Sequence, residues 1–252
     1  MYEPCHCWGV KRSWRPSLIA GTALLLGILF AALTAAVLMG LTNDVDLAET
    51  RALQAVDWGP LQPAFSMSDQ WDGLRQVSIG LCVIVIVFAL DRALGVAALL
   101  CSGSGGLWYL LELWTARPRP DEHLVHVVRH ASGGGYPSGH VVFYFWALVM
   151  IALALAVRLP RRLRVLPGIV AIAALSIVCV GRVAFGEHWP SDIEGGLLLG
   201  GAWILGVLWL QRAWLQLKER RVARFTQSPS SAPSARRRRS ETPVRQTPTP
   251  KA

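Results

Sequence analysis

Six stretches of nearly uninterrupted apolar residues occur along this 252-residue chain. A helix that crosses a membrane needs about 20 such residues, with a range of roughly 17–25. The stretches are Leu18–Met39, Val77–Leu90, Ala93–Leu113, Val141–Val157, Val165–Val180 and Ile193–Leu210. Two of them have short apolar cores, which flanking residues must extend. The pattern predicts an all-α fold, a polytopic membrane helix bundle with six transmembrane spans.

The composition fits this interpretation. Hydrophobic residues make up 53% of the chain and charged residues only 16%, whereas soluble domains carry about 25% charged residues. The first stretch is longer than the apolar region of a typical signal peptide, so we expect a retained anchor. The net charge of +9 is concentrated in a Ser/Pro-rich tail with arginines at 236–239 and beside the apolar stretches. That distribution is typical of membrane proteins and argues against a nucleic-acid partner.

The distribution of basic residues also predicts the topology. A break at Asp91-Arg92 separates the second and third spans, and six spans place both termini in the cytoplasm. The cytoplasmic segments then hold 19 of the 25 basic residues, as the positive-inside rule requires. A five-span alternative would export one basic tail.

Three regions follow from this topology. We expect a cytoplasmic N-terminal tail over 1–16, a six-span membrane domain over 17–225 and a disordered basic tail over 226–252. The tail has almost no large apolar residues. Its arginines would contact anionic lipid of the inner leaflet, or serve only as a topology signal.

The first external segment, Thr42–Asp72, is acidic and contains aromatic residues. Its acids are Asp44, Asp46, Glu49, Asp57, Asp69 and Asp72, and its aromatic residues include Trp58 and Trp71. Tryptophan favours the membrane interface. The segment is therefore predicted either to lie on the bilayer beside the substrate entrance or to be a solvated connector.

Ionisable residues gather where three of the spans end. Arg117-Pro118-Arg119-Pro120 follows the third span, Pro137-Ser138-Gly139-His140 precedes the fourth, and Arg182, His188 and Asp192 surround the connection between the fifth and sixth. The topology, assigned without these motifs, places all of them on the non-cytoplasmic face. Because ionisable residues at membrane depth tend to be functional, we expect one site on that face.

The middle segment has the features of an anion site. Ser138 is placed to cap the following helix, whose first turn presents free N–H groups and a partial positive charge. Gly139 would let the backbone approach a phosphate closely. His140 would then lie where it can protonate a departing oxygen. Taken alone, a glycine-rich loop with a capping serine explains the segment equally well.

The third segment pairs a histidine with a carboxylate. Asp192 can fix the tautomer of His188 and stabilise its imidazolium, as in a poised base or nucleophile. Arg182 would offer a planar fork to phosphate oxygens. The alternative is a helix-end salt bridge beside an interfacial histidine. The three segments together predict a site that binds a phosphate group and removes it, and the membrane setting predicts a lipid substrate.

These segments resemble the three signature motifs of the type 2 phosphatidic acid phosphatase superfamily. The family pattern is Lys-x6-Arg-Pro, then Pro-Ser-Gly-His, then Ser-Arg-x5-His-x3-Asp. The similarity covers about Glu112–Asp192, and the six-helix layout covers most of the chain. The second motif matches in full. Gly181 replaces the serine of the third motif, and Glu112 replaces the lysine of the first.

The resemblance implies a lipid phosphatase that needs neither a metal nor a cofactor. His188 would attack phosphorus and form a phosphohistidine, Asp192 would orient it, and His140 would be the acid for the leaving group. The phosphoryl oxygens would be held by Arg119, Ser138, the Gly139 amide and Arg182. The residues alone do not decide which histidine attacks.

Glu112 is the main departure from the family pattern. Two like charges about 4 Å apart interact unfavourably by about 4 kcal/mol at an effective dielectric constant near 20. Glu112 would therefore point away, pair with Arg117 or Arg129, or tune the enzyme to an unusual substrate. Pairing is the outcome that we expect.

Several functions compete at this stage. The first is hydrolysis of an isoprenoid diphosphate or a phosphatidate-type lipid, with the diphosphate slightly favoured. A non-catalytic relative that binds or moves phospholipid, a haloperoxidase-like enzyme and a transporter are the alternatives. The expected location is a bacterial inner membrane with the active site facing the periplasm or exterior. The oligomeric state is left open.

Overall fold

The computed structural model describes residues 16–69 and 73–227. Every regular element in those ranges is helical. The elements are α1 (Pro16–Leu38), α2 (Asn43–Gln54), η1 (Gly59–Leu61), α3 (Gln62–Asp69), α4 (Gly73–Leu90), α5 (Arg92–Ser102), α6 (Ser104–Thr115), α7 (Gly139–Arg158), η2 (Arg161–Leu163), α8 (Leu166–Ala184) and α9 (Pro190–Gln227). The predicted tails at 1–16 and 226–252 lie almost entirely outside the described residues, so what we expect of them stays a prediction.

Six helical segments are long and apolar enough to cross a membrane. They are Pro16–Leu38, Gly73–Leu90, Arg92–Thr115, Gly139–Arg158, Arg161–Ala184 and Pro190–Val222. The all-α, six-span prediction is confirmed. The sides of the membrane on which the two termini lie stay a prediction.

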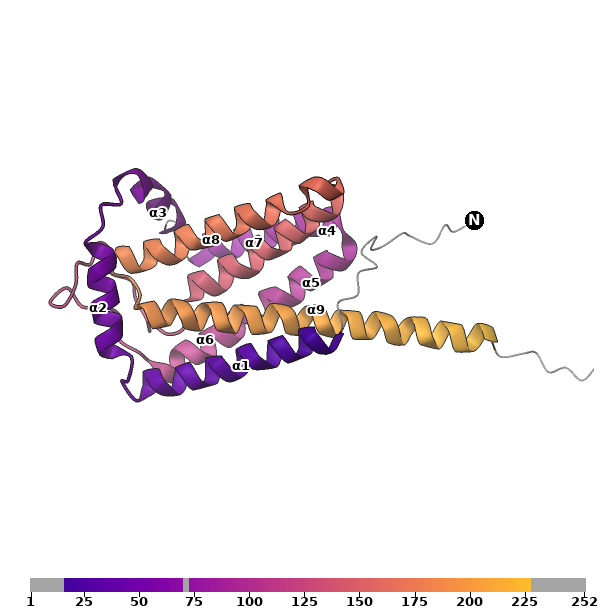
Figure 1. Cartoon of the computed structure of the whole chain (residues 1–252), viewed down its shortest axis with the longest axis horizontal. Coiled ribbons are helices and arrows are strands. Elements are labelled where there is room, and N and C mark those ends of the chain that lie inside the picture. The colour runs from indigo at the N-terminus through magenta and orange to yellow at the C-terminus, as the bar shows by residue number, and fades with distance from the viewer. Residues whose placement is uncertain (1–15, 70–72, 228–252) are drawn as a thin grey trace, which may run out of the picture. The chain divides into compact units, whose positions relative to one another are not determined.

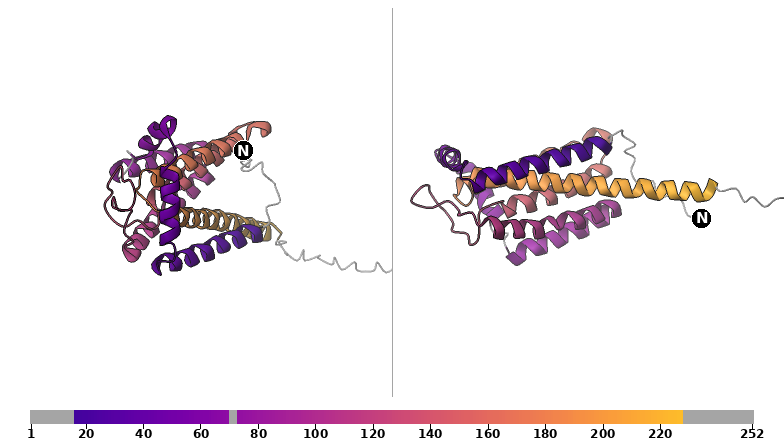
Figure 2. Two further views of the ribbon diagram at one scale, coloured as in Figure 1. Left: turned by 60° about the vertical axis from the view of Figure 1, so that its left-hand side comes forward. Right: turned by 90° about the horizontal axis from the view of Figure 1, so that it is seen from below.

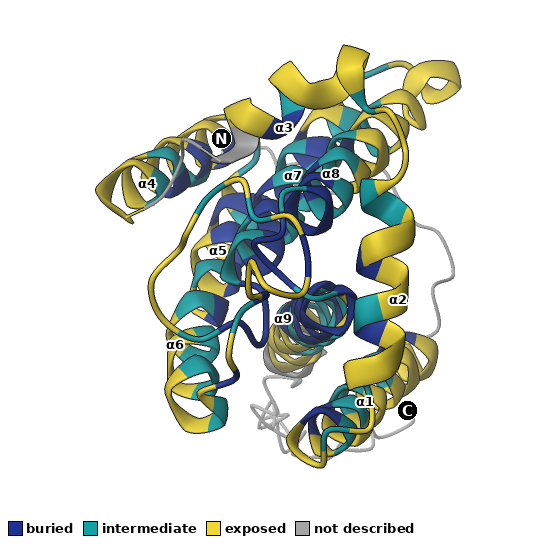
Figure 3. Ribbon diagram, turned by 90° about the vertical axis from the view of Figure 1, so that its left-hand side faces the viewer, coloured by how far each residue is buried: buried dark blue, intermediate teal, exposed yellow. Residues whose placement is uncertain are grey.

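The helices up to Trp214 belong to one compact unit, and the residues from Leu215 onward form a second. Within the first unit the long helices run side by side, and α2 lies across one end of them (Figures 1 and 2). The end-on view in Figure 3 shows the start of α9 among the other helices, with buried residues gathered around it. The motif-bearing ends of α6, α7, α8 and α9 meet at this end.

The predicted break between the second and third spans is confirmed. α4 ends at Leu90, and the Asp91 side chain caps α5 by accepting a hydrogen bond from the Leu94 N–H at 2.9 Å. The third span was expected to be one helix. It consists instead of α5 and α6, which meet at Gly103.

The bundle core contains many small residues. Ala97 and Ala98 of α5 pack with Ala147 and Ala154 of α7 in one buried cluster. Small side chains let neighbouring helices approach closely. In a membrane the lipid is as apolar as the side chains, so close packing, and not the hydrophobic effect, holds the helices together. Large apolar side chains instead cover the outer surface, as in α1, where Leu24 is 66% exposed. This arrangement suits a protein surrounded by lipid.

Two glycines of α9 bring the second and third motifs together. A Cβ on Gly195 would lie 2.6 Å from the Tyr136 ring, and one on Gly196 would lie 3.0 Å from the Ser138 carbonyl oxygen. The Ser138 N–H also donates to the Asp192 carbonyl at 3.0 Å. The first turn of α9 therefore packs directly on the chain that leads into α7.

Candidate active site

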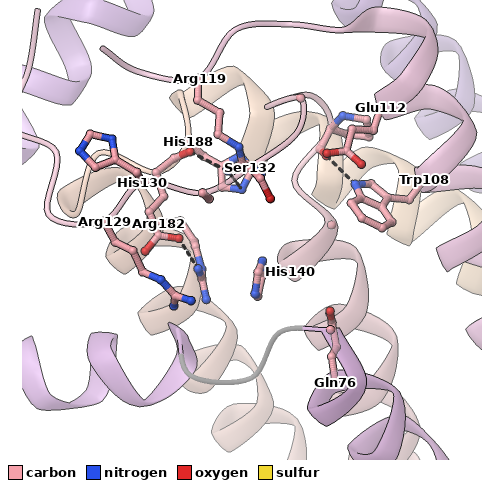
Figure 4. Close-up of a pocket in the computed structure, with 16 residues that line it drawn as sticks. Gln76, Trp108, Glu112, Arg119, Arg129, His130, Ser132, His140, Arg182 and His188 are labelled. Atoms are coloured by element: carbon pink, nitrogen blue, oxygen red, sulfur yellow. Dashed lines mark hydrogen bonds and ion pairs between the residues drawn. The ribbon is translucent and has the colours of Figure 1, made fainter. Parts of the chain in front are cut away.

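A polar cavity of about 600 Å³ lies where α7 and α9 begin and α6 and α8 end. The Arg119, Arg182, His140 and His188 side chains point toward its open space (Figure 4). The remaining lining residues are Gly73, Gln76, Trp108, Glu112, Arg129, His130, Ala131, Ser132, Gly134, Pro137, Gly139 and Glu187. One cavity therefore brings together residues from all three motifs.

His188 has a defined tautomer. Its Nδ1 lies 2.9 Å from the carbonyl oxygen of Gly135, and because a carbonyl can only accept, Nδ1 carries the proton. Its Nε2 lies 3.1 Å from Arg119 Nη1 and so accepts a hydrogen bond from that guanidinium. The basic nitrogen of His188 consequently faces the cavity.

His188 is buried, with 1% of its surface exposed. Burial lowers the pKa of His188 below its usual value, and the nearby Asp192 carboxylate opposes this shift. Because desolvation disfavours the imidazolium, His188 is neutral over a wider pH range than an exposed histidine. A neutral imidazole is the form that can act as a nucleophile.

Asp192 lies behind His188 instead of lining the cavity. Its Oδ2 is 3.5 Å from His188 Nδ1 and accepts the Trp189 N–H at 2.9 Å. That second bond is the one a carboxylate makes at the third position of a helix, where it reaches back to the residue before the first turn. Local helix capping thus fixes Asp192 beside His188. The sequence predicts that the two residues are neighbours, but it does not predict this capping.

Arg182 and Glu187 form a buried ion pair. Arg182 Nη1 donates to Glu187 Oε2, and the two side chains are 2% and 3% exposed. The Arg182 carbonyl also accepts the N–H groups of Glu187 and His188. This pairing, which sequence reasoning missed, holds the guanidinium at the cavity wall. The only sequence signal for this ion pair is that a carboxylate, Glu187, follows Arg182 by five residues.

Arg119 contacts the chain on both sides of the cavity. Its Nη1 donates to the Glu187 carbonyl at 2.9 Å, and its Nε lies 3.4 Å from the Gly133 carbonyl. Burial lowers the pKa of Arg119. Because Nη1 also reaches His188, a phosphate oxygen bound by Arg119 would lie directly beside the unprotonated nitrogen of His188.

The Pro-Ser-Gly-His segment departs from the predictions at the helix cap. Ser138 is the residue before α7, but its hydroxyl makes no capping hydrogen bond. Among the described residues, this buried hydroxyl is one of a few polar side-chain groups without a partner. Gly139 is required by packing, because a Cβ there would lie 2.3 Å from the Trp108 indole; its contact with a phosphate stays a prediction.

The sequence predicts that Glu112 pairs with Arg117 or Arg129, but Arg117 is not its partner. Both ends of the Arg117 guanidinium are bound by Asp46 and Asp192, which draws it away from the cavity. The Glu112 carboxylate lines the cavity and interacts favourably with the Arg119 guanidinium and the Gly134 amide. The Glu112 carboxylate therefore lies beside Arg119, one of the residues predicted to bind the phosphate.

Gly181 and Asp46 also have roles that the motifs did not indicate. A Cβ on Gly181 would lie 2.9 Å from the Phe65 ring, so the serine of the family pattern would clash with α3. Phe65 is buried, and α3 packs on α8. Asp46 was noted only as one of several acids in an external segment. Over residues 16–69 and 73–227, no group of three or more His, Cys, Asp or Glu side chains is arranged to hold a metal ion.

Comparison with known proteins identifies the family. The PAP2 superfamily pattern matches residues 87–216, about half of the chain. The chain therefore belongs to the PAP2 superfamily, as its motifs predict.

Two relatives are named phosphatases. Phosphatidylglycerophosphatase B of Bacillus subtilis (strain 168) is 28% identical over 136 residues, which cover 52% of this chain and 53% of that protein. The chain thus aligns with about half the length of this curated relative. The crystal structure of a transmembrane PAP2-type phosphatidylglycerolphosphate phosphatase from Bacillus subtilis matches with a TM-score of 0.66 and 22% identity. That match covers 76% of this chain and 96% of the other, and it shows the shared fold.

Proposed function

We propose that this protein is a membrane phosphatase that hydrolyses the phosphate monoester of a lipid. The observation that carries the proposal is the environment of His188, whose Nδ1–H is bound by Gly135 and whose Nε2 faces a cavity containing Arg119 and His140. Phosphoryl transfer depends mainly on positioning and on stabilising charge. These side chains can supply both.

The first chemical step would form a covalent intermediate. His188 Nε2 attacks phosphorus, the bond from phosphorus to the lipid oxygen breaks, and a protonated His140 gives its proton to that oxygen. Arg119 and Arg182 bind the phosphoryl oxygens. An incoming phosphate would draw Arg119 away from Nε2, and this releases the nitrogen lone pair for the attack.

The second step would regenerate the enzyme. The neutral His140 takes a proton from water, the water oxygen attacks phosphorus, and the phosphorus–nitrogen bond breaks. Inorganic phosphate leaves, and His188 returns to its neutral form. Asp192 stabilises the positive charge that His188 carries in the intermediate.

A neighbouring apolar groove supports a lipid substrate. A cavity of about 380 Å³ lies between α4, α5, α6 and α7 and shares Gln76, Trp108 and Gly139 with the polar cavity. Its other walls include Val77, Leu81, Ile84, Val142, Phe143 and Trp146. A lipid whose phosphate lies beside His188 can place the start of its chain in this groove.

The charge of the cavity favours a monoester over a diphosphate. Its charged lining comprises Arg119, Arg129 and Arg182 against Glu112 and Glu187. With His140 protonated, as the first step requires, and the other histidines neutral, this leaves two net positive charges, which match the charge of a phosphate monoester better than the larger charge of a diphosphate. We therefore place a glycerophospholipid monoester, the class named for both relatives, ahead of the isoprenoid diphosphate.

A turnover assay tests the proposal. The purified protein in detergent with EDTA is given phosphatidylglycerophosphate, phosphatidate and a short-chain isoprenoid diphosphate, and released phosphate is measured. We expect release from a monoester, and we expect it to disappear in His188→Ala and His140→Ala. The EDTA tests the predicted independence of metal ions.

The second candidate is a catalytically weak relative that binds or moves phospholipid. Glu112 favours it, because a carboxylate in the cavity opposes the charge that develops during phosphoryl transfer. Binding of all three lipids without any phosphate release would support this candidate and contradict the first.

A further inference from the structure

A buried line of charged hydrogen bonds runs from the candidate active site to α2. Arg117 Nη1 donates to Asp192 Oδ1 at 2.6 Å, and Arg117 Nη2 donates to Asp46 Oδ2 at 2.6 Å. The side chains of Arg117, Asp46 and Asp192 are 8%, 3% and 0% exposed. None of the three lines the cavity, so their contacts serve one another instead of the substrate.

Ser191 forms a second connection between Arg117 and Asp46. Its hydroxyl accepts from Arg117 Nη1 at 2.7 Å and donates to Asp46 Oδ2 at 2.7 Å. Its backbone N–H donates to Asp46 Oδ1 at 2.9 Å. Asp46 therefore holds the first turn of α9 one residue before Asp192. Arg117 Nη2 is further fixed by the Thr42 hydroxyl at 3.1 Å.

The arrangement determines how Asp192 can act on His188. Its Oδ1 is occupied by Arg117, and its Oδ2 is left for His188 and the Trp189 N–H. If Arg117 had no second carboxylate partner, its positive charge would largely neutralise the negative charge of Asp192. Because the Asp46 and Asp192 carboxylates each lie 2.6 Å from the Arg117 guanidinium, the positive charge of Arg117 is divided between them. Two carboxylates and one guanidinium leave one net negative charge behind the histidine.

We propose that Asp46 is a positioning residue for phosphoryl transfer. It holds Arg117 and Ser191 so that Asp192 keeps its orientation and its charge beside His188. This inference rests on the proposed function. Asp46 and Thr42 lie outside residues 87–216, which match the family, so α2 adds a supporting part that the three motifs do not contain.

The substitution Asp46→Asn is a sharp test because an amide cannot replace both carboxylate oxygens. Both oxygens of Asp46 accept hydrogen bonds, one from Ser191 N–H and the other from Arg117 and the Ser191 hydroxyl. An asparagine offers one acceptor and one donor. Either orientation of the amide therefore faces one N–H donor with another.

The experiment compares kcat and KM for lipid-phosphate hydrolysis in detergent. We expect Asp46→Asn to lower kcat about tenfold to hundredfold, the effect of losing one strong charged hydrogen bond. KM should change less than about threefold, since Arg119 and Arg182 are untouched. The matched control is Asp44→Asn, the same change at an exposed position of α2, which should leave both constants unchanged.

A thermal midpoint measured on each variant separates positioning from folding. If Asp46→Asn does not fold, Ser191→Ala takes its place, because it removes the bridging hydroxyl and keeps all three charges. That variant should lower kcat by roughly threefold to tenfold. A folded Asp46→Asn or Ser191→Ala with an unchanged kcat, or with a raised KM alone, would overturn the inference.

The outcomes also distinguish this inference from the proposed function. No turnover by the unsubstituted protein would contradict the proposed function. Turnover that requires His188, together with an Asp46→Asn variant that behaves like Asp44→Asn, would contradict only the role of Asp46.

Discussion

At the scale of a single side chain, the two ring nitrogens of His188 have different environments, and this difference supports the nucleophilic role that we propose for the residue. Nδ1 donates to Gly135 and lies near Asp192, while Nε2 is directed to the cavity. Burial disfavours the charged ring. The backbone carbonyl thus selects the tautomer, and in the proposed mechanism the carboxylate stabilises the charge that attack would place on the ring.

The lowered pKa of His188 predicts the acid side of the pH profile. Activity requires the neutral ring, and a pKa below the usual value of about 6.5 lets that form persist to lower pH. The acid limb of kcat/KM should therefore lie below pH 6.5. Asp192 raises this pKa, so Asp192→Asn should move the limb to still lower pH and reduce kcat. An acid limb above pH 7 would contradict this assignment.

Glu112 predicts a gain of function. Glu112→Lys replaces a negative charge beside Arg119 with a positive one, and the cavity then attracts phosphate more strongly. KM for the lipid phosphate should fall about threefold to tenfold, and more for a diphosphate than for a monoester. Glu49→Lys, the same change at an exposed residue outside the cavity, is the control. Loss of activity in Glu112→Lys alone would show that the carboxylate has a role of its own.

At the scale of elements, α3 occupies the space that the serine of the family pattern would need on α8. Phe65 lies against Gly181 of α8, where the family has serine, and also against Phe185 with ring centroids 5.8 Å apart. The missing serine is therefore explained by helix packing.

This packing predicts that restoring the serine is harmful. Gly181→Ser would overpack the contact with Phe65 and should destabilise the protein by about 1–3 kcal/mol. A lower thermal midpoint in detergent would reveal the change. In Phe65→Ala the same substitution should cost much less, because the clash is gone. Equal costs in both backgrounds would show that the contact does not explain the glycine.

The sequence predicted the helices of this fold well because apolar length determines them. The Asp91 break was also predictable, since an acid followed by an arginine is costly within a span. The division at Gly103 was missed, although Ser102-Gly103-Ser104-Gly105-Gly106 is a cluster of residues that disfavours a continuous helix, because the apolar residues on both sides led us to expect one span. α2 and α3 were missed because their low apolar content gave no clear signal in an acidic segment.

The candidate site was predicted only where a motif carries the chemistry. Arg119, His140, Arg182 and His188 line one cavity as expected. The partner Asp46 escaped prediction because its pairing depends on how distant segments fold together, whereas Glu187 lies only five residues after Arg182 and was missed because the motif does not include it. Asp46 is 71 residues from Arg117 in sequence, and no local spacing indicates such a contact.

At the scale of the whole molecule, the charge distribution predicts which side of the membrane the site faces. Single cysteines placed at Glu122 and at Arg162 of an otherwise cysteine-free variant test it in intact cells. An impermeant maleimide should label position 122, in the loop between α6 and α7, and not position 162, within η2. Labelling in the opposite pattern would place the site on the cytoplasmic side.

The phosphoenzyme is the most direct test of the central claim that His188 attacks phosphorus. Protein mixed with a ³²P-labelled lipid monoester is quenched within milliseconds, and the label bound to the chain is analysed. We predict label that is stable in base and labile in acid, as phosphohistidine is, and its absence in His188→Gln. Rapid phosphate release with no bound label, or label that persists in His188→Gln, would contradict the mechanism.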